Sequence, residues 1–282
     1  MINRRTFVKS LTASVVVSMI LPARLNAIPL KKIIGIQLYT LRDLIKEDFE
    51  GTLKSIAQIG YNSVEAAGYY DGKFYKLSPK AYKKIVADNG LISISTHTAI
   101  DPKNAQLVID NSLGAGMAYI VLPSIGKELR NTLDDYKKLA DKFNIIGELC
   151  KNSGIAFAYH NHAYEFEAME GVIPYNILLE RTEPELVSFQ LDTYWVVYGG
   201  YDPVTYFKNY PGRFKLWHIK DMDATPKRES TEVGQGTIDF KAIFASKKIA
   251  GMKYYFVEQE SFNMPLLESV KISFDYLNNL NY

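Results

Sequence analysis

The stretch that decides the fold runs from residue 118 to residue 160 and reads AYIVLPSIGKELRNTLDDYKKLADKFNIIGELCKNSGIAFAYH. It begins with the short apolar run AYIVLP (118–123) and ends with another, IAFAYH (155–160). Between them, residues 131–152 have the pattern of an amphipathic helix. Two strands joined in this way run parallel, because a crossover is needed to return the chain to the same edge of the sheet. The stretch therefore predicts one strand–helix–strand unit of a parallel sheet.

The same alternation of short apolar runs and helical patterns continues along the chain. The strand candidates span residues 33–39, 63–67, 91–96, 118–123, 155–160, 187–192, 214–219 and 254–258. The helix candidates include residues 47–59, 79–89, 103–113, 131–152, 174–182, 202–209, 240–249 and 266–279. Eight such units in about 250 residues match the size of a TIM barrel. We therefore expect residues 28–282 to form a single-domain (β/α)8 TIM barrel, an α/β fold.

An open, doubly wound sheet is the alternative to a barrel. Such a sheet usually has a glycine-rich phosphate-binding turn after its first strand. The segment QLYTLRD (37–43), at the end of the first strand candidate, contains no glycine. The barrel is therefore the prediction.

The first 27 residues differ in character from the rest of the chain. The segment NRRTFVKSLTASVVVSMILPARLNA (3–27) has the pattern R-R-x-F-x-K, an apolar stretch over 11–21 and small residues at its end. It resembles a twin-arginine export signal, and its apolar part is too short to span a bilayer comfortably. We predict a signal peptide over residues 1–27 and a periplasmic protein without a stable membrane anchor. A Sec signal or an uncleaved anchor is the alternative.

The charge balance argues against nucleic acid as a partner. The chain has 33 basic and 31 acidic residues, and removal of residues 1–27 would remove four basic residues and no acidic one. The remaining chain would be weakly acidic, whereas affinity for nucleic acid comes largely from neutralising phosphates. The single Cys150 cannot form an internal disulfide. Assembly into a homo-oligomer stays open.

Chemically active side chains collect at the ends of the predicted strands. In a TIM barrel, the active site lies at the C-terminal ends of the strands. The residues at or beside those ends are Gln37, Glu65, His97, His160, Asp192, His218 and Glu258. Three of the four histidines belong to this set, and His162 follows two residues after His160. We therefore expect the histidines to gather at one rim of the barrel.

Asp192, His218 and Glu258 end the sixth, seventh and eighth predicted strands, which are neighbours in a barrel. With His160 from the fifth strand they form a set typical of the ligands of one divalent cation, such as Mn²⁺, Co²⁺, Zn²⁺ or Mg²⁺. Buried carboxylates at this density would repel each other without a cation. Each residue taken alone would be an ordinary hydrogen-bonding group, so the prediction depends on all four together.

Other side chains near this rim are candidates for contact with a small-molecule substrate. Glu65 and His97 are placed to hydrogen-bond substrate hydroxyls, or else they are ordinary residues of the barrel mouth. His162 is expected beside them, with Glu165 as the residue that orients it.

Aromatic and basic residues complete the candidate site. Tyr39, Tyr194 and Trp195 offer flat apolar faces on which C–H groups of a substrate can stack, although aromatic residues at such positions often serve only packing. Lys220, two residues after His218, is a candidate for stabilising a negatively charged substrate oxygen. The alternative for Lys220 is a solvated loop residue or an ion pair with Asp221.

The chain from about residue 32 onward resembles the xylose isomerase-like TIM-barrel superfamily, which includes the sugar phosphate isomerases and epimerases. The resemblance rests on these segments: GIQLYTLRD (35–43), YHNHAYEF (159–166), LDTYWVVYGGYDP (191–203), WHIKD (217–221), GQGTIDF (234–240) and FVEQE (256–260). Together they are specific to the superfamily but not to one reaction.

The resemblance implies a metal site in which the epimerases use Glu, Asp, His and Glu from strands five to eight. By position this implies Asp192, His218 and Glu258 as ligands. The chain departs from the pattern at strand five, where His160 replaces the glutamate, and whether His160 or His162 is the fourth ligand stays open. The epimerases use two glutamates on opposite faces of the substrate, whereas here Glu258 would face His160, His162 or Glu165.

These features predict a divalent-metal-dependent enzyme of the sugar isomerase and epimerase type. It would remove a proton beside the carbonyl of a sugar or keto-sugar substrate, through a metal-stabilised enediolate, with Glu258, His160 and Lys220 as catalytic residues. Glu65 and His97 would then hydrogen-bond the sugar hydroxyls. One alternative is a periplasmic lyase or hydratase that acts on 3-keto-glycosides by the same chemistry. Another is a carbohydrate-binding barrel without catalysis. A nuclease of the same superfamily is disfavoured, because it needs three zinc ions and the chain has four histidines in all.

Overall fold

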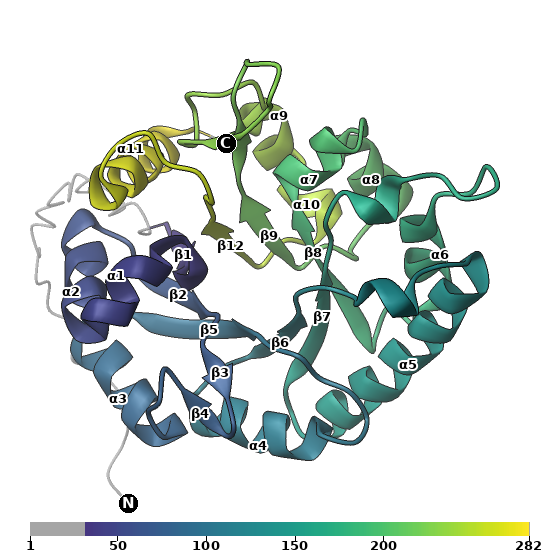
Figure 1. The fold of residues 1–282 in the computed structure, drawn as a ribbon, viewed down its shortest axis with the longest axis horizontal. Helices are drawn as coiled ribbons and strands as arrows, with labels where there is room; N and C mark the ends of the chain where they lie inside the picture. The colour runs from purple at the N-terminus through teal and green to yellow at the C-terminus, as the bar shows by residue number, and fades with distance from the viewer. Residues whose placement is uncertain (1–31, 282) are drawn as a thin grey trace, which may run out of the picture. The chain divides into compact units, whose positions relative to one another are not determined.

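Eight parallel strands close into a barrel in the computed structural model, which describes residues 32–281 (Figure 1). The strands are β1 (Gly35–Gln37), β2 (Ser63–Ala66), β5 (Ile92–His97), β6 (Tyr119–Leu122), β7 (Ala156–His160), β8 (Val187–Asp192), β9 (Leu216–Ile219) and β12 (Tyr254–Val257). Each strand pairs with the next barrel strand along the chain, and β1 pairs with β12 to close the ring. The predicted barrel is confirmed. The predicted signal segment, residues 1–27, lies outside the described residues.

Helices surround the barrel on its outer side, as Figure 1 shows. They are α1 (Arg42–Glu47), α2 (Phe49–Ile59), α3 (Pro79–Asp88), α4 (Ala105–Gly114), α5 (Leu133–Asn152), α6 (Pro174–Arg181), α7 (Thr193–Tyr198), α8 (Pro203–Asn209), α9 (Phe240–Ala245), α10 (Lys247–Ala250) and α11 (Leu266–Asn279). All eight helices expected from the sequence are present. The helix predicted over 240–249 is split into α9 and α10. The helices α1 and α7 were missed because each has only six residues.

Two small hairpins lie outside the barrel sheet and were not predicted. They are formed by β3 (Tyr69–Tyr70) with β4 (Lys73–Phe74), and by β10 (Asp221–Met222) with β11 (Ser230–Thr231). In the first, the turn residues Asp71 and Gly72 both have positive φ, as a two-residue hairpin turn requires. Strands of two residues are too short for their periodicity to be recognised in the sequence.

The longest helix, α5, shows how local sequence and packing cooperate. It begins with a capping box in which the Thr132 side chain accepts from the Asp135 backbone and the Asp135 side chain accepts from the Thr132 backbone. Its buried face includes Phe143 and Ile146 and packs on β7. At Gly147 the helix approaches the Leu186 carbonyl so closely that an added Cβ would lie 2.4 Å from its oxygen.

The barrel interior is filled by packed side chains, and the site lies above them. Ile94, Val121, Ala158, Leu216 and Phe256 form a buried cluster contributed by five different strands. Their packing excludes water from the middle of the barrel. Within residues 32–281, no helix combines the length and the apolar character needed to cross a membrane.

Candidate metal centre and active site

Four buried side chains bring potential metal-ligating atoms together at the C-terminal ends of the strands. One donor atom each from His160, Asp192, His218 and Glu258 lies within 4.8 Å of the other three. These atoms can surround one cation, since metal–ligand distances near 2 Å place opposite ligands about 4 Å apart. A second group, His97, His160 and His218, overlaps the first.

The strands fix the positions of these four residues. His160 and Asp192 are the last residues of β7 and β8, and Asp192 pairs in register with His218 of β9. Glu258 directly follows β12. Asp192 also begins α7, because its Oδ1 accepts a hydrogen bond from the Trp195 backbone at 3.0 Å. Its side chain is therefore held at the strand–helix junction.

Two of the four residues present buried atoms that have no hydrogen-bond partner among the described residues. His160 Nδ1 and Asp192 Oδ2 make no hydrogen bond, although both atoms are inaccessible to solvent. An unpaired buried polar atom is costly, and a buried carboxylate oxygen more so. A divalent cation would satisfy both atoms, so the donor set fits a metal site.

Glu65 lies beneath this cluster instead of facing a substrate. It is fully buried, and it accepts hydrogen bonds from Gln37 (2.7 Å), Ser95 (2.6 Å) and Gln190 (2.8 Å). His218 Nε2 lies 2.6 Å from Glu65 Oε1. We expected Glu65 to hydrogen-bond sugar hydroxyls, but its oxygens are occupied by the protein. Its geometry is that of a carboxylate that orients a ligand histidine, leaving His218 Nδ1 toward Asp192 and Glu258.

Glu258 and His218 hold each other ionised, whereas the ionisation of Asp192 is opposed by its surroundings. Burial opposes the charge on Glu258, but the positive charges of His218 and Lys220 outweigh it and keep the pKa of Glu258 well below its usual range. Burial also opposes the charge on His218, yet Glu258 and Glu65 raise the pKa of His218 to about 10. Burial and the charge of Glu258 raise the pKa of Asp192 to about 7, against the effect of Lys220.

The other three histidines are kept neutral. Burial lowers the pKa of His160 and His97, and nearby His218 lowers both further. Burial also lowers the pKa of His162 to about 4. The rings form one cluster, with His160 centroids 4.9 Å from His97, 4.7 Å from His218 and 5.0 Å from His162. The expected gathering of histidines at one rim is confirmed.

Lys220 is fully buried and bridges two acids. Its Nζ lies 2.6 Å from Glu260 Oε1 and 3.7 Å from Glu258 Oε2. The ammonium also lies 4.9 Å from the Trp195 ring centroid and 5.1 Å from that of Tyr194. The solvated loop lysine and the pair with Asp221, which we considered from the sequence, are both wrong. The Asp221 carboxylate instead accepts backbone hydrogen bonds, one of them from Gly234 at 2.9 Å.

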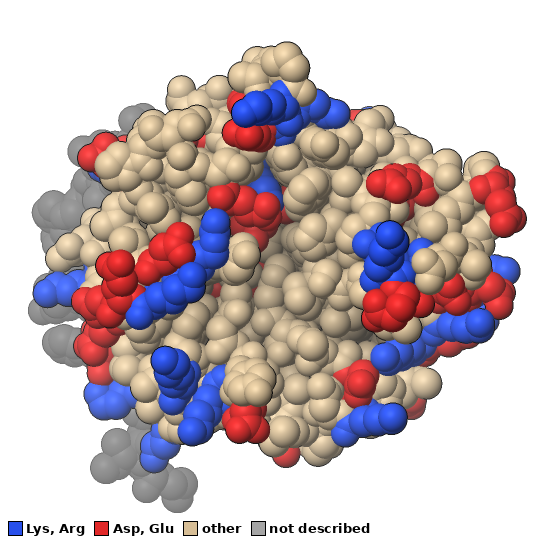
Figure 2. Space-filling view, in the orientation of Figure 1, with Lys and Arg blue, Asp and Glu red and all other residues tan. Residues whose placement is uncertain are grey.

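A cavity of about 540 Å³ opens above the four-residue cluster. Its lining consists of Tyr39, Arg42, Ala67, His97, Pro123, Ser124, His160, His162, Glu258, Glu260 and Ser261. Figure 2 shows a hollow near the centre of this face, with acidic and basic side chains beside it. Four predicted site residues besides Glu258 thus line the cavity, whereas Arg42, Ser124, Glu260 and Ser261 were not singled out from the sequence.

Trp195 and Glu165 do not line the cavity but lie next to His162. The Trp195 ring centroid is 5.5 Å from that of His162, and the Tyr164 ring stacks on His162 at 5.6 Å. Glu165 is fully buried and accepts hydrogen bonds from the His162 backbone N–H at 2.9 Å and from the Tyr159 hydroxyl. These contacts fix the direction of the His162 ring toward the cavity.

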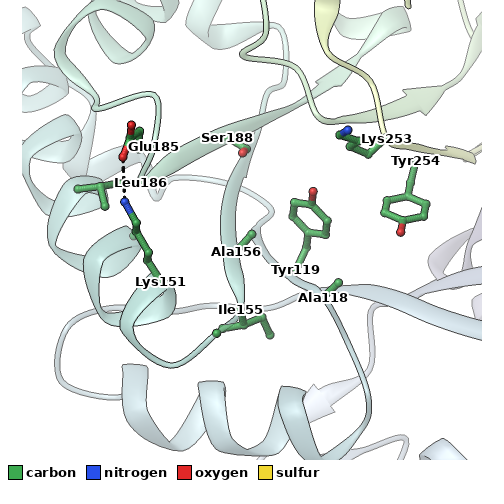
Figure 3. Close-up of a pocket in the computed structure, with 12 residues that line it drawn as sticks. Ala118, Tyr119, Lys151, Ile155, Ala156, Glu185, Leu186, Ser188, Lys253 and Tyr254 are labelled. Atoms are coloured by element: carbon green, nitrogen blue, oxygen red, sulfur yellow. Dashed lines mark hydrogen bonds and ion pairs between the residues drawn. The ribbon is translucent and has the colours of Figure 1, made fainter.

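A second hollow, shown in Figure 3, lies at the opposite end of the barrel. It is lined by residues at the beginnings of strands, among them Tyr119, Ala156 and Tyr254. The ion pair between Lys151 and Glu185, 3.0 Å, lies at its edge (Figure 3). Lys151 and Glu185 neutralise each other, which leaves Lys253 as the third charged residue of the lining. This end of a TIM barrel generally serves stability. The chemistry therefore belongs to the other end.

The family model of the xylose isomerase-like TIM barrel matches residues 53–280. The chain therefore belongs to this family, and the resemblance found in the sequence is confirmed. Among solved structures, a sugar phosphate isomerase/epimerase from Parabacteroides distasonis is 32% identical, with a TM-score of 0.81. That match covers 92% of this chain and 98% of the other. The chain is thus related along nearly its whole length to proteins described as sugar-converting enzymes.

Curated relatives include inosose dehydratases. The one from Geobacillus kaustophilus is 31% identical over 141 residues, which are 44% of this chain and 44% of the relative. The one from Bacillus anthracis is 23% identical over 242 residues, which are 74% of this chain and 80% of the relative. The first match spans less than half the length of the dehydratase. These relatives support the expectation of an enzyme that acts on a small, sugar-like molecule.

Proposed function

We propose that the protein is a divalent-metal-dependent enzyme that removes a proton from the carbon beside a sugar carbonyl, in the manner of the sugar isomerases and epimerases. The observation that carries this proposal is the convergence of His160, Asp192, His218 and Glu258 within 4.8 Å beneath a cavity. A cation held by these residues would supply a Lewis acid that acidifies the C–H group beside the carbonyl.

The chain's own residues have distinct roles in this proposal. The ionised Glu258 reaches the cavity and is the candidate base, and the neutral imidazoles of His160 and His162 face the same space as candidate proton acceptors or donors. Lys220 carries a buried positive charge near Glu258 and would stabilise negative charge that develops on the substrate oxygen. When a cation is bound through His218 Nδ1, Glu65 would accept the remaining proton on Nε2 and so hold His218 in one tautomer.

A lyase that eliminates a substituent from a 3-keto-glycoside is the second candidate. Two observations favour it. The curated relatives are named dehydratases, which are eliminating enzymes, and the residue on strand β7 is His160 where an epimerase would have a glutamate. Elimination needs one base and a path for the leaving group, so it tolerates this replacement better than epimerisation does.

We also propose that the protein is exported to the periplasm. The basis is the R-R-x-F-x-K pattern and the apolar stretch within residues 1–27. Arg4→Lys together with Arg5→Lys is expected to leave the unprocessed chain in the cytoplasm. Equal amounts of wild type and double variant in the periplasmic fraction would contradict the twin-arginine route.

The reaction is tested with the purified protein loaded with Mn²⁺, Co²⁺ or Zn²⁺ and incubated in D₂O with ketoses or 3-oxidised glucosides. Deuterium at the carbon beside the carbonyl, seen by NMR, supports the proposal, and release of the aglycone identifies the lyase. Glu258→Gln should abolish exchange, whereas the exposed Glu268→Gln on α11 should not. Stoichiometric metal without exchange or elimination on any of these substrates would show that the proposed reaction is wrong.

A further inference from the structure

The cavity is larger than a single sugar ring requires. Its volume of about 540 Å³ compares with about 200 Å³ for the twelve heavy atoms of a hexose at close packing. We divide its lining into an inner part, formed by His97, His160, His162 and Glu258, and an outer part, formed by Tyr39, Arg42, Ser124, Glu260 and Ser261. The inner part includes two of the four proposed metal ligands, His160 and Glu258. The outer part has no role in the proposed reaction.

Tyr39 supplies a fixed aromatic surface in the outer part. Its backbone N–H donates to Gln37 Oε1 at 3.1 Å, and the Arg42 guanidinium lies 4.7 Å from its ring centroid. Arg42 also donates to the carbonyls of Tyr39 (3.2 Å) and Glu260 (3.3 Å). Tyr39 nevertheless stays 47% exposed. An aromatic residue that is held in place yet open to a polar cavity suits stacking against the C–H groups of a sugar ring.

The charges of the outer part do not favour an anion. Arg42 is its only cation and is engaged with backbone carbonyls, while Glu260 contributes a carboxylate. The nearby Lys220 is paired with Glu260. Phosphate sites usually combine several Arg or Lys groups, or the N–H groups of a helix N-terminus. The hydroxyls of Ser124 and Ser261 and the Glu260 carboxylate suit the hydroxyl groups of an uncharged sugar.

We propose that the outer part of the cavity is a second subsite, with Tyr39 as its platform, for an uncharged sugar ring linked to the ring that reacts beside Glu258. The substrate class is then a neutral glycoside of two rings, and neither a free monosaccharide nor a sugar phosphate. This inference rests on the proposed function for the location of the reacting ring. It adds a binding site that the reaction itself does not require.

The test measures binding apart from turnover. The Zn²⁺-loaded protein is titrated with cellobiose, maltose, glucose and glucose 6-phosphate, followed by saturation-transfer NMR. At least one disaccharide is expected to bind roughly five times more tightly than glucose, with saturation of protons on both rings. Binding of glucose 6-phosphate more tightly than both disaccharides, or no binding of either disaccharide, would overturn the proposal.

Variants at Tyr39 make the test specific. Tyr39→Ala should weaken disaccharide binding roughly five- to tenfold and glucose binding less than twofold, because only the second ring loses its contact. Tyr39→Phe keeps the ring and should bind as the wild type does. Tyr70→Ala, which removes an 83% exposed tyrosine outside the cavity, is the matched control. Equal loss of glucose and disaccharide binding in Tyr39→Ala would refute the subsite.

The two proposals can fail separately. Metal content and deuterium exchange report on the inner part, whereas the difference between disaccharide and glucose binding reports on Tyr39. A protein that shows Tyr39-dependent disaccharide binding without exchange would refute only the proposed reaction. A protein that exchanges deuterium but prefers glucose or its phosphate would refute only the second subsite.

Discussion

The two carboxylate oxygens of Asp192 have different roles, one in the local structure and one in the candidate metal site. Oδ1 accepts the Trp195 backbone N–H and so begins α7, while Oδ2 is buried without a hydrogen-bond partner. The first contact needs only an oxygen, which an asparagine would also provide. The second oxygen is useful only if a cation binds it. The charge of Asp192 is thus costly to the metal-free protein and valuable to the metal-bound one.

Asp192→Asn is expected to stabilise the metal-free protein at pH 8 by roughly 1 kcal/mol, because it removes a buried charge whose pKa is raised to about 7. It should also abolish the increase in melting temperature that Mn²⁺ gives the wild type. Urea unfolding and calorimetry measure the two effects. Asp202→Asn, at the exposed N-cap of α8, is the matched control. It should change neither the stability of the metal-free protein nor the increase in melting temperature with Mn²⁺. Undiminished stabilisation of Asp192→Asn by Mn²⁺ would refute its role as a ligand.

The raised pKa of Glu165 should make the stability of the protein depend on pH, independently of the proposed metal ligands. Burial raises the pKa of Glu165 to about 8 from an ordinary value of 4.5. The folded state therefore holds a proton that the unfolded state has lost between these two pH values. Since the folded state then binds more protons, the free energy of unfolding falls as pH rises from about 4.5 to about 8.

Glu165→Gln should make this decline smaller, because glutamine does not titrate. Urea unfolding of the metal-free protein at pH 5, 6.5 and 8 gives the comparison. The Glu167→Gln variant, changed at an exposed position two residues away, controls for the loss of a negative charge. Its free energy of unfolding should fall with pH as that of the wild type does. Parallel declines in the wild type and in Glu165→Gln would show that Glu165 is already ionised in the folded protein.

At the scale of one element, α5 shows a conflict between helix propensity and packing. An alanine in place of a mid-helix glycine usually stabilises a helix by about 1 kcal/mol. At Gly147 the added Cβ would lie 2.4 Å from the Leu186 carbonyl oxygen, and that oxygen belongs to a backbone held at the start of β8. The contact cannot be relieved by turning a side chain. Packing therefore decides whether Gly147→Ala raises or lowers the free energy of unfolding.

We expect Gly147→Ala to destabilise the protein by about 2 kcal/mol, as overpacking of a well-filled interior does. Chemical denaturation measures the change in the free energy of unfolding. Glu148→Ala, at the next and exposed position of α5, should stay within about 0.5 kcal/mol of the wild type. A more stable Gly147→Ala variant would show that α5 can move away from Leu186.

The elements at the barrel mouth were the least predictable from the sequence. The hairpins β3–β4 and β10–β11 and the helix α7 each have few residues, so they carry no detectable period. They are stabilised by contacts such as the hydrogen bond between Asn111 of α4 and Tyr69, at 3.0 Å. Such contacts join residues far apart in the chain, and local patterns contain no information about them.

For the whole molecule, closure of the barrel depends on its first strand. Gly35 and Ile36 of β1 pair with β12 on one side and with β2 on the other. Just before β1, the Lys32 ammonium donates to the carbonyls of Leu277 and Leu280 near the end of α11. The two ends of the described chain are thereby joined, and an unpaired edge strand is avoided.

A chain that starts at residue 28 is expected to melt within about 2 °C of the full-length chain, because all barrel contacts are kept. A chain that starts at residue 38 lacks β1 and should be unfolded or aggregated, since the edges of β2 and β12 are then exposed. Circular dichroism and light scattering distinguish these outcomes. A large loss of stability in the longer variant would show that residues 1–27 contribute to the fold.

The sequence by itself determined the order and type of the barrel elements and the rim that carries the chemistry. The reason is that hydrophobic periodicity is a local property, and that parallel strands all end on the same side of a barrel. His160, Asp192, His218 and Glu258 could therefore be grouped before their distances were known. The same argument could not separate them from Glu65, which also ends a strand.

Only the tertiary structure decided how deep each of these side chains lies and what it contacts. Glu65 turned out to support His218, and Lys220 to pair with Glu260 instead of Asp221. These outcomes depend on the register between neighbouring strands and on the loops that fold over the mouth. Both are set by contacts between residues far apart in the chain, 40 positions for Lys220 and Glu260 and 125 for Glu65 and Gln190, and no local pattern in the chain encodes them.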